Sequence, residues 1–315
     1  MSWIVIGGSG FVGSAVVQAI RQAGIEVRAV RAPRLTTTAT TPVALAAEVK
    51  ARSATEFERL QALVAGSTVV INAAGLAAPS SGLTPALLGA NALLPAVLGR
   101  AAAAAGVQRF VHLSSAAVQG RSAMLDETDT TRPFSAYSRS KALGEQALTL
   151  AAADGQLSSV IVRATSVQGP GRPTTAKLGR LARSPLASVA SPGTARTPVT
   201  SVAALADLVV AVGRHPSPVP PVVLQPWEGM TVRSVLEAAG GSPRVLPAGL
   251  CTVVTRSGYG LPALLGGRFD GQVRRVELMW FGQDQVSGWA EAAGIVPTPR
   301  VREVLAAVRT GGLPG

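Results

Sequence analysis

The sequence predicts an α/β protein built on a Rossmann-type doubly wound parallel sheet, with a smaller C-terminal substrate-binding lobe. Residues 3–31 contain an apolar strand, a glycine-rich turn, an amphipathic helix and a second strand. Strand and helix patterns then alternate as far as residue 170, which indicates a parallel sheet covered on both faces. With 315 residues, 47% of them hydrophobic, the chain can bury a full core. We place an NAD(P)-binding domain at residues 1–170, with segments near 197–225 returning to it, and the substrate-binding lobe at 171–315.

The turn after the first strand carries two overlapping glycine spacings, Gly8-x-Gly10-x-x-Gly13 and Gly7-x-x-Gly10-x-x-Gly13. Between a strand and a helix, such glycines permit a tight turn, close approach of backbone to a pyrophosphate, and close packing of the helix on the strand. Free amides at the helix start and the helix dipole then favour phosphate. The pattern predicts a dinucleotide site formed by Gly7, Ser9, Gly10, Phe11, Val12 and Gly13.

The second strand ends in arginine rather than in an acidic residue. The helix at residues 14–23 stops at Gly24, and the strand that follows ends at Arg31. An NAD site usually has a carboxylate here that bonds the ribose hydroxyls, whereas arginine can pair with a ribose 2′-phosphate. Arg31 and Arg34 therefore favour NADP(H) over NAD(H) as cofactor; the alternative is that both are solvated loop arginines.

The next part of the cofactor half contains small residues after a buried strand. We expect a third strand near residues 42–46 and a helix over 54–65. The strand at 68–72 runs into Ala73, Ala74 and Gly75, whose small side chains let the backbone approach a flat cofactor ring. Residues 84–105 are predicted to be helical, with Asn91 in apolar surroundings. A buried amide needs partners, so Asn91 is either a structural hydrogen-bonder or a residue that supports the active site.

The remaining elements follow in the same βα order and then become irregular. We expect strands at 107–113 and 160–163 and a long helix that begins near Tyr137 and ends at Ala152. From residue 171 to 196 the composition shifts to Pro, Gly, Ser, Thr and Arg, which marks the boundary of the cofactor half. Beyond it we expect a short strand from 197, a helix over 202–212, a strand at 222–224, a helix over 232–239, an irregular region that includes Trp280, Phe281 and Trp289, and a final helix over 301–309.

Tyr137 and Lys141 lie four residues apart on one predicted helix, so their side chains share a face. A phenol with a pKa of about 10 exchanges protons poorly at neutral pH, and a nearby ammonium group lowers that pKa. Ser115, at the end of a strand, can donate a hydrogen bond to a reacting carbonyl oxygen while Tyr137 gives or takes its proton. The three residues predict hydride transfer between a nicotinamide and a carbonyl or secondary alcohol.

Taken together, these segments resemble the extended short-chain dehydrogenase/reductases of the epimerase/dehydratase family, which includes nucleotide-sugar epimerases, dehydratases and 4-ketoreductases. The matching segments, in the family's order, are Gly7–Gly13, Asn72–Gly75, Asn91, Ser114–Gly120, Tyr137–Lys141, Arg163–Gly171 and Val202–Asp207. The resemblance implies that Gly7, Gly10 and Gly13 cradle the pyrophosphate and that Ser115 orients the carbonyl. It also implies that Tyr137 is the acid/base, that Lys141 bonds the nicotinamide ribose, and that Asn91 supports this region. Ala164 completes the expected cofactor-binding set.

Departures from the family pattern reduce the number of reactions that the chain is expected to catalyse. Dehydratases carry an Asp-Glu pair after the catalytic serine or threonine, but this chain has Ala116 and Ala117, which disfavours dehydration. Epimerases usually hold NAD through an acid at the place of Arg31. The favoured function is therefore an NADP(H)-dependent oxidoreductase, most simply a 4-ketoreductase on a nucleotide-sugar-like substrate. The alternatives are an NAD(P)-dependent 4-epimerase and a non-catalytic NADP-binding sensor or assembly protein.

Basic residues after the boundary suggest an anionic small-molecule substrate. Arg172, Lys177 and Arg196, with Arg180 and Arg183, lie where a substrate diphosphate would bind, unless they belong to a solvated flexible loop. The expected substrate site contains Ser115, Gln119, Tyr137, Arg172, Lys177 and Arg196. A net charge of +12 agrees with an anionic ligand, although an arginine-rich composition explains most of it. Nucleic acid is not expected, because the arginines are scattered and no aromatic residues interleave with them.

Several partners and compartments are not expected. The sequence shows no membrane-length apolar run and no basic leader before the first strand, so we expect a cytoplasmic protein with no membrane partner. One cysteine (Cys251) and two histidines (His112 and His215) leave no basis for disulfides or a metal site. From the family resemblance we expect a homodimer through the helices at 84–105 and 137–152.

Overall fold

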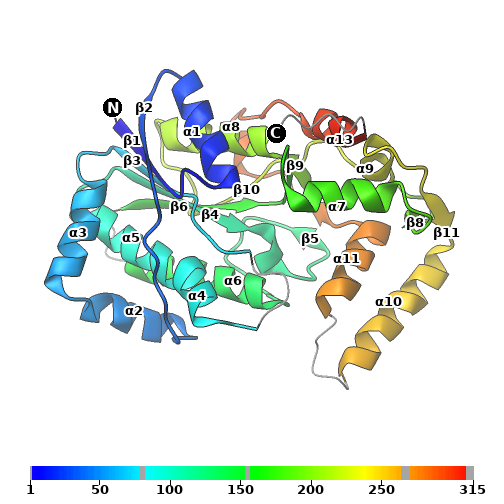
Figure 1. Ribbon diagram of the computed structural model, residues 1–315, viewed down its shortest axis with the longest axis horizontal. Coiled ribbons are helices and arrows are strands. Elements are labelled where there is room, and N and C mark those ends of the chain that lie inside the picture. The colour runs from blue at the N-terminus through cyan, green and yellow to red at the C-terminus, as the bar shows by residue number, and fades with distance from the viewer. Residues whose placement is uncertain (1, 78–81, 153–156, 264–269, 310–315) are drawn as a thin grey trace.

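The central sheet has six parallel strands in the order β10-β6-β4-β3-β1-β2. The structure is a computed structural model and describes residues 2–77, 82–152, 157–263 and 270–309. Figure 1 shows the sheet crossing the molecule with helices on both sides. The strands are β1 (Ser2–Ile6), β2 (Glu26–Val30), β3 (Val69–Asn72), β4 (Arg109–Ser115), β6 (Ser158–Ala164) and β10 (Val222–Leu224). The Rossmann-type parallel sheet predicted from the sequence is confirmed.

Each central strand is apolar on both faces because helices cover both. Val70 and Phe110 point to the core under α5 (Leu94–Ala104) and α6 (Ala136–Ala151). Ile71 and Val111 point to the other core, under α1 (Phe11–Gln22) and α8 (Val202–Arg214). Strands buried on both faces have continuous apolar runs rather than alternating ones, which explains why they were readable in the sequence.

The direction of winding reverses between β1 and β3, which are neighbours in the sheet. In an open parallel sheet a ligand binds at the carboxyl ends of the strands at this point. The same edge brings together Gly7 after β1, Ala73 after β3, Ser115 at the end of β4 and Ala164 at the end of β6. The fold therefore gathers the predicted cofactor and catalytic residues at one edge.

The expected third strand near residues 42–46 is wrong, because this segment forms helix α2 (Pro42–Ala51). Thr41 accepts a hydrogen bond from the Ala44 amide as N-cap, Pro42 occupies the first turn, and helix formers follow. The helix α3 (Ala54–Val64) comes next, as predicted. In the described part of the sheet, β2 is consequently the edge strand.

Helix α2 and its approach segment cover the helices that were expected to form a dimer. Leu45 is fully buried in the core under α5 and α6, and Arg100 on α5 donates to the Val49 carbonyl at 2.7 Å. On α6 the exposed side chains are Arg139, Gln146, Thr149 and Leu150, whereas α5 exposes only Ala104 at its end. Helix α2 therefore covers much of the face at 84–105 and 137–152, and the homodimer expected through these helices stays a prediction.

The helix beneath α2 is apolar on every side. It comprises α4 (Pro85–Leu88), the π-helical turn η1 (Gly89–Leu93) and α5. The sequence analysis found no apolar run of membrane length, and this is corrected: residues 85–104 form one helix that is long and apolar enough to cross a membrane. Of its apolar window, 78% is buried inside the protein. A helix that is apolar all round must be covered on all sides, and here the sheet, α6, α2 and α3 cover it.

The C-terminal part is more helical than the sequence predicted. The segment for which a solvated flexible loop was one alternative forms α7 (Pro173–Ala182). The region expected to be irregular contains α10 (Ala248–Ala263) and α11 (Asp270–Phe281). The predicted helices α9 (Val232–Ala238) and α13 (Val301–Arg309) are confirmed. Short elements complete the chain: η2 (Ala116–Gln119), β5 (Met124–Leu125), β7 (Ser166–Gln168), β8 (Ser188–Ala190), β9 (Val199–Ser201), β11 (Arg244–Leu246), β12 (Asp284–Gln285) and α12 (Trp289–Ala292).

Candidate active site

The glycine-rich turn has the geometry of a phosphate cradle. Gly7 has a φ of 81°, and a Cβ there would lie 2.9 Å from the Ala74 backbone. A Cβ on Gly13 would lie 2.1 Å from the Gly7 carbonyl oxygen, so the helix can approach the strand only without a side chain. Ser9 and Gly10 are exposed at the start of α1, where free amides favour an anion. These residues fit the pyrophosphate of a dinucleotide.

Asn91 clamps the loop after β3 to helix α6. Its Oδ1 accepts from the Leu76 amide, and its Nδ2 donates to the Leu76 carbonyl and to Ser140 Oγ, each at 2.9 Å. The clamp sits in the π-helical turn η1, a feature often found at functional sites. A Cβ on Gly75 would lie 3.0 Å from both Asn91 Oδ1 and Lys141 Nζ. Asn91 thus fixes the backbone around Gly75 and Leu76, beside which the Lys141 side chain lies.

Ser115 and Tyr137 meet at the carboxyl edge of the sheet. Ser115 caps η2, and its hydroxyl accepts from the Ala117 amide at 3.2 Å, which leaves its hydrogen free to donate. Tyr137 is half-buried in the first turn of α6, whose start is fixed by the capping box of Ser135 and Ser138. Burial raises the pKa of the Tyr137 phenol, while hydrogen bonding with Ser115 and the charge of Arg172 lower it.

Lys141 is buried beside the site and is held by the main chain. Its Nζ donates to the Leu113 carbonyl at 2.9 Å, and its side chain is 5% exposed. Burial lowers the pKa of Lys141 to about 8, although the Glu145 carboxylate raises it. The sequence analysis expected Lys141 to lower the pKa of Tyr137. Burial instead raises the pKa of this phenol overall, and the cation that opposes the rise is Arg172.

Arg172 lies between the glycine-rich turn and the phenol. Its guanidinium carbon lies 4.9 Å from the centre of the Phe11 ring, and its Nη1 donates to the Val167 carbonyl at 2.5 Å. Burial lowers the pKa of Arg172, and its interaction with Tyr137 opposes that effect. Because the arginine stands at the N-cap of α7, it is held in place rather than carried on a solvated loop.

A buried ion pair lies one helical turn beyond Lys141. Arg163 Nη2 donates to Glu145 Oε2 at 2.7 Å, and the two side chains are 0% and 5% exposed. Ser114 donates to the other oxygen of Glu145 at 2.5 Å, and Arg163 also donates to the Thr128 carbonyl. This network joins α6, β4 and β6 beneath the site. The sequence analysis missed Glu145, although its spacing of four from Lys141 on the helix was readable.

The other predicted substrate residues, Gln119, Lys177 and Arg196, do not join the Tyr137 site in the structure. Gln119 is 2% exposed, and its amide donates to Asp126 Oδ1 and accepts from the Asp126 amide, so it braces a loop and is not free for substrate. Arg196 is exposed, stacks on Trp227 at 4.5 Å and pairs with Asp284. Lys177 is exposed on α7. No hydrogen bond or ion pair between described residues joins Lys177 or Arg196 to the Tyr137 site.

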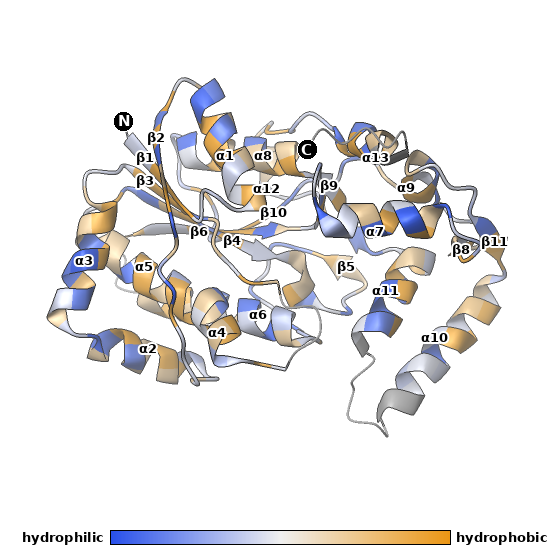
Figure 2. Ribbon diagram, in the orientation of Figure 1, coloured by the Kyte–Doolittle hydropathy of each residue, from blue (hydrophilic) through white to orange (hydrophobic). Residues whose placement is uncertain are grey.

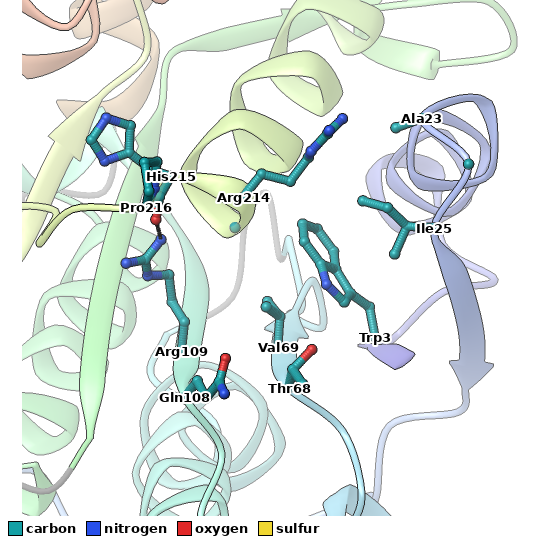
Figure 3. Close-up of a pocket in the computed structure, with 12 residues that line it drawn as sticks. Trp3, Ala23, Ile25, Thr68, Val69, Gln108, Arg109, Arg214, His215 and Pro216 are labelled. Atoms are coloured by element: carbon teal, nitrogen blue, oxygen red, sulfur yellow. Dashed lines mark hydrogen bonds between the residues drawn. The ribbon is translucent and has the colours of Figure 1, made fainter. Parts of the chain in front are cut away.

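One cavity lies away from this site, at the opposite edge of the sheet. It has a volume of about 700 Å³ and is lined by Trp3, Arg109 and Arg214, among others. Figure 3 shows Arg109 reaching the end of α8, where it donates to the His215 carbonyl. It also donates to the Val212 and Ser217 carbonyls. Arg109 therefore caps the carboxyl end of a helix, and this cavity is not assigned to the reaction.

The charge on Lys141 predicts a pH dependence. We expect activity to fall as pH rises through about 8, because Lys141 loses its proton there and its positive charge leaves the site. The free energy of unfolding responds in the opposite sense. Between pH 8 and the usual lysine pKa of 10.5, Lys141 has lost its proton in the folded chain but keeps it in the unfolded chain. Because the unfolded state binds the extra proton, Lys141 adds to the stability of the fold as pH rises through this range. A pH profile of kcat/KM beside urea unfolding at the same pH values tests both, and parallel loss of both quantities would contradict the assignment.

Comparisons with known proteins identify the family and the fold. The sequence profile of the NAD dependent epimerase/dehydratase family matches residues 3–223. Solved structures with a similar fold include MoeE5 in complex with UDP-glucuronic acid and NAD (23% identity, 97% of each chain, TM-score 0.62). They also include UDP-glucuronic acid 4-epimerase from Bacillus cereus in complex with UDP-glucuronic acid and NAD (19%, 98% of each chain, 0.64). A third is dTDP-4-dehydrorhamnose reductase from Bacillus anthracis in complex with NADP (15%, 98% of each chain, 0.61). No curated protein sequence matches the chain.

Proposed function

Because the chain belongs to the NAD dependent epimerase/dehydratase family, we propose that it is an NADP(H)-dependent oxidoreductase acting on a carbonyl or secondary alcohol, most simply a 4-ketoreductase on a nucleotide-sugar-like substrate. The observation that carries the proposal is the contact of Ser115 with Tyr137 at the sheet edge that also holds the glycine-rich turn. The bound nicotinamide supplies or accepts the hydride. The chain's own residues orient the carbonyl and move the proton.

The proton transfer follows from the arrangement of four side chains. Ser115 donates to the carbonyl oxygen while its own oxygen stays bonded to the Ala117 amide, which fixes its direction. Tyr137 delivers its phenolic proton to the same oxygen, and the resulting phenolate is stabilised by the Arg172 guanidinium. Lys141, held by the Leu113 carbonyl, supplies a donor on the cofactor side of the site.

The proposed preference for NADP(H) rests on two exposed arginines. Arg31 and Arg34 follow β2 at the edge where an adenosine ribose binds, and neither forms an ion pair with a described carboxylate. A 2′-phosphate would accept charge-assisted hydrogen bonds from both.

Replacing Arg31 and Arg34 together by alanine is expected to weaken NADPH binding about 10²- to 10⁴-fold and to leave NADH binding nearly unchanged. Each lost charged hydrogen bond costs about 1.5–3 kcal/mol net, and about 1.4 kcal/mol is a factor of ten. Fluorescence titration of both cofactors measures the effect, and Arg59→Ala, an exposed arginine on α3, serves as the matched control. Equal loss for both cofactors would contradict the 2′-phosphate contact.

Two observations support an anionic, nucleotide-sugar-like substrate. Arg172 presents its guanidinium beside Tyr137, where an acidic group of a substrate would be held. Two structures with a similar fold were determined with UDP-glucuronic acid. In this proposal Lys177 and Arg196 contact the more distant phosphates when the substrate is bound.

A 4-epimerase is the second candidate, because similar structures include a 4-epimerase with NAD. The two activities differ in cofactor balance. A reductase consumes one NADPH for each keto-sugar nucleotide that it reduces, whereas an epimerase interconverts the 4-hydroxyl configuration with no net cofactor change. Incubation with keto-sugar nucleotides and NADPH, monitored at 340 nm and by product analysis, separates them. Absence of both reactions over a broad substrate panel, with cofactor binding intact, would favour a non-catalytic sensor.

A further inference from the structure

Helix α10 carries a row of exposed aliphatic side chains on its outer face. Leu250, Val253 and Val254 are 54%, 62% and 46% exposed, and Val245 on the preceding strand β11 is 46% exposed. Positions 250, 253 and 254 follow helical spacing and therefore form one stripe. Figure 2 shows α10 at the periphery of the molecule, with apolar residues along much of its length. Contiguous exposed apolar surface of this kind marks an interaction site.

The opposite face of the same helix is already packed. Cys251 is fully buried, Thr255 is 6% exposed, and a Cβ on Gly258 would lie 3.2 Å from Val273 of α11. The helix is therefore anchored by its inner face. Its outer stripe is not needed for packing within the described chain.

Positive charge surrounds the stripe. Arg244 and Arg256 are exposed beside it. A cavity of about 260 Å³ between α10 and α11 is lined by Arg256, by Arg121, which is 54% exposed, and by Glu277. Glu277 is paired with the buried Arg274 at 2.9 Å, so its charge is already compensated. Arg121 also pairs with Glu277, at 3.9 Å. Arg244 and Arg256 form no ion pair with a described carboxylate, so the surface combines aliphatic side chains with these two uncompensated arginines, in a chain of net charge +12.

We propose that the outer face of α10 docks on an anionic phospholipid surface, with its aliphatic stripe at the acyl boundary and the flanking arginines at the phosphate head groups. Interfacial helices have this division between apolar and basic residues, and each basic residue adds attraction to an anionic leaflet. The sequence analysis predicted no membrane partner from the lack of a spanning run, but a helix that lies in the surface needs none.

A second copy of the chain fits this face less well. Four half-exposed side chains fall short of the roughly 800 Å² per partner that a stable interface buries. A symmetric contact through α10 would also bring the arginines of two strongly positive chains together. An anionic surface instead neutralises them.

Co-sedimentation of the full-length protein with vesicles tests the proposal. We expect binding to vesicles of phosphatidylglycerol and phosphatidylcholine, little binding to pure phosphatidylcholine, and release as salt is raised. The variant Leu250→Gln/Val253→Gln/Val254→Gln should bind at least about tenfold more weakly, and Arg256→Gln severalfold more weakly. Glutamine is a good helix former, so α10 is kept.

Matched controls place the same changes elsewhere. Val43→Gln/Leu150→Gln/Val296→Gln removes three exposed aliphatic side chains, and Arg59→Gln removes an exposed arginine on α3. Both should bind vesicles like the wild type, and NADPH binding should persist in every variant, which also separates this test from the proposed function. Wild type that stays in the supernatant with anionic vesicles overturns the proposal. So does an α10 variant that binds as well as wild type, or light scattering that shows a dimer dissociated by the α10 changes.

Discussion

Replacing Tyr137 by phenylalanine is expected to lower kcat roughly 10²- to 10⁴-fold while NADPH binding is retained. The change removes only the phenolic hydroxyl, which is the proton donor or acceptor for the reacting oxygen. The ring that fills the first turn of α6 remains, and the Ser135–Ser138 capping box does not involve the phenol. Stopped-flow reduction with the best substrate, beside NADPH titration, separates the chemical step from binding.

The chain offers its own control for this change, because it has two tyrosines. Tyr259 on α10 donates to Glu277 at 2.6 Å, in the C-terminal part and away from the sheet edge. Tyr259→Phe should keep wild-type kcat. If Tyr137→Phe also keeps it, the assigned acid/base is wrong. If it loses NADPH binding to the same degree, the phenol acts in binding rather than in proton transfer.

The parts of this site that depend on local spacing could be predicted from the sequence. Gly7, Gly10 and Gly13 lie in one turn, and Tyr137 and Lys141 lie on one helix face, so short-range geometry already fixes their relations. The buried parallel strands were equally clear, because each is a continuous apolar run bounded by small residues.

What could not be predicted depends on contacts between distant segments. Arg172 follows Tyr137 by 35 residues in a stretch rich in Pro and Gly, and nothing in its spacing shows that it faces the phenol rather than solvent. The backbone carbonyl that holds Lys141 belongs to β4, 28 residues away. Gln119 was assigned to substrate because its partner Asp126 lies across a loop whose path the sequence does not fix.

The error at residues 42–51 has a different cause, because the local signal was present. Thr41 and Pro42, followed by Ala, Leu, Glu and Lys, favour a helix start, but the preceding run of Thr and Ala obscures where the helix begins. The helix then packs on α5 and α6, a contact that a strand at this place would not make. The hairpin of α10 and α11 escaped prediction because α10 is apolar on its outer side, which hides the helical period.

Breaking the buried pair of Glu145 and Arg163 is expected to have the largest effect on stability. Glu145→Leu leaves the Arg163 guanidinium fully buried with no carboxylate, and an uncompensated buried charge costs about 3–5 kcal/mol. The same change removes the carboxylate that raises the pKa of Lys141, so the alkaline fall in activity should move to lower pH. Urea unfolding of the variant measures the first effect, and the pH profile of kcat/KM measures the second.

The double variant Glu145→Leu/Arg163→Met provides the control, because it removes both charges and keeps aliphatic volume in the core. Replacing a whole buried ion pair by apolar residues is often neutral or stabilising, so the double variant should recover most of the lost free energy of unfolding. The alkaline limb should nevertheless stay shifted, since Lys141 still lacks its carboxylate. If stability recovers but the pH profile does not, Glu145 has two separate roles. It holds α6 to β6 through Arg163, and it raises the pKa of Lys141. Additive losses in the double variant would instead show that the two side chains act independently, and that the network beneath the site does not couple them.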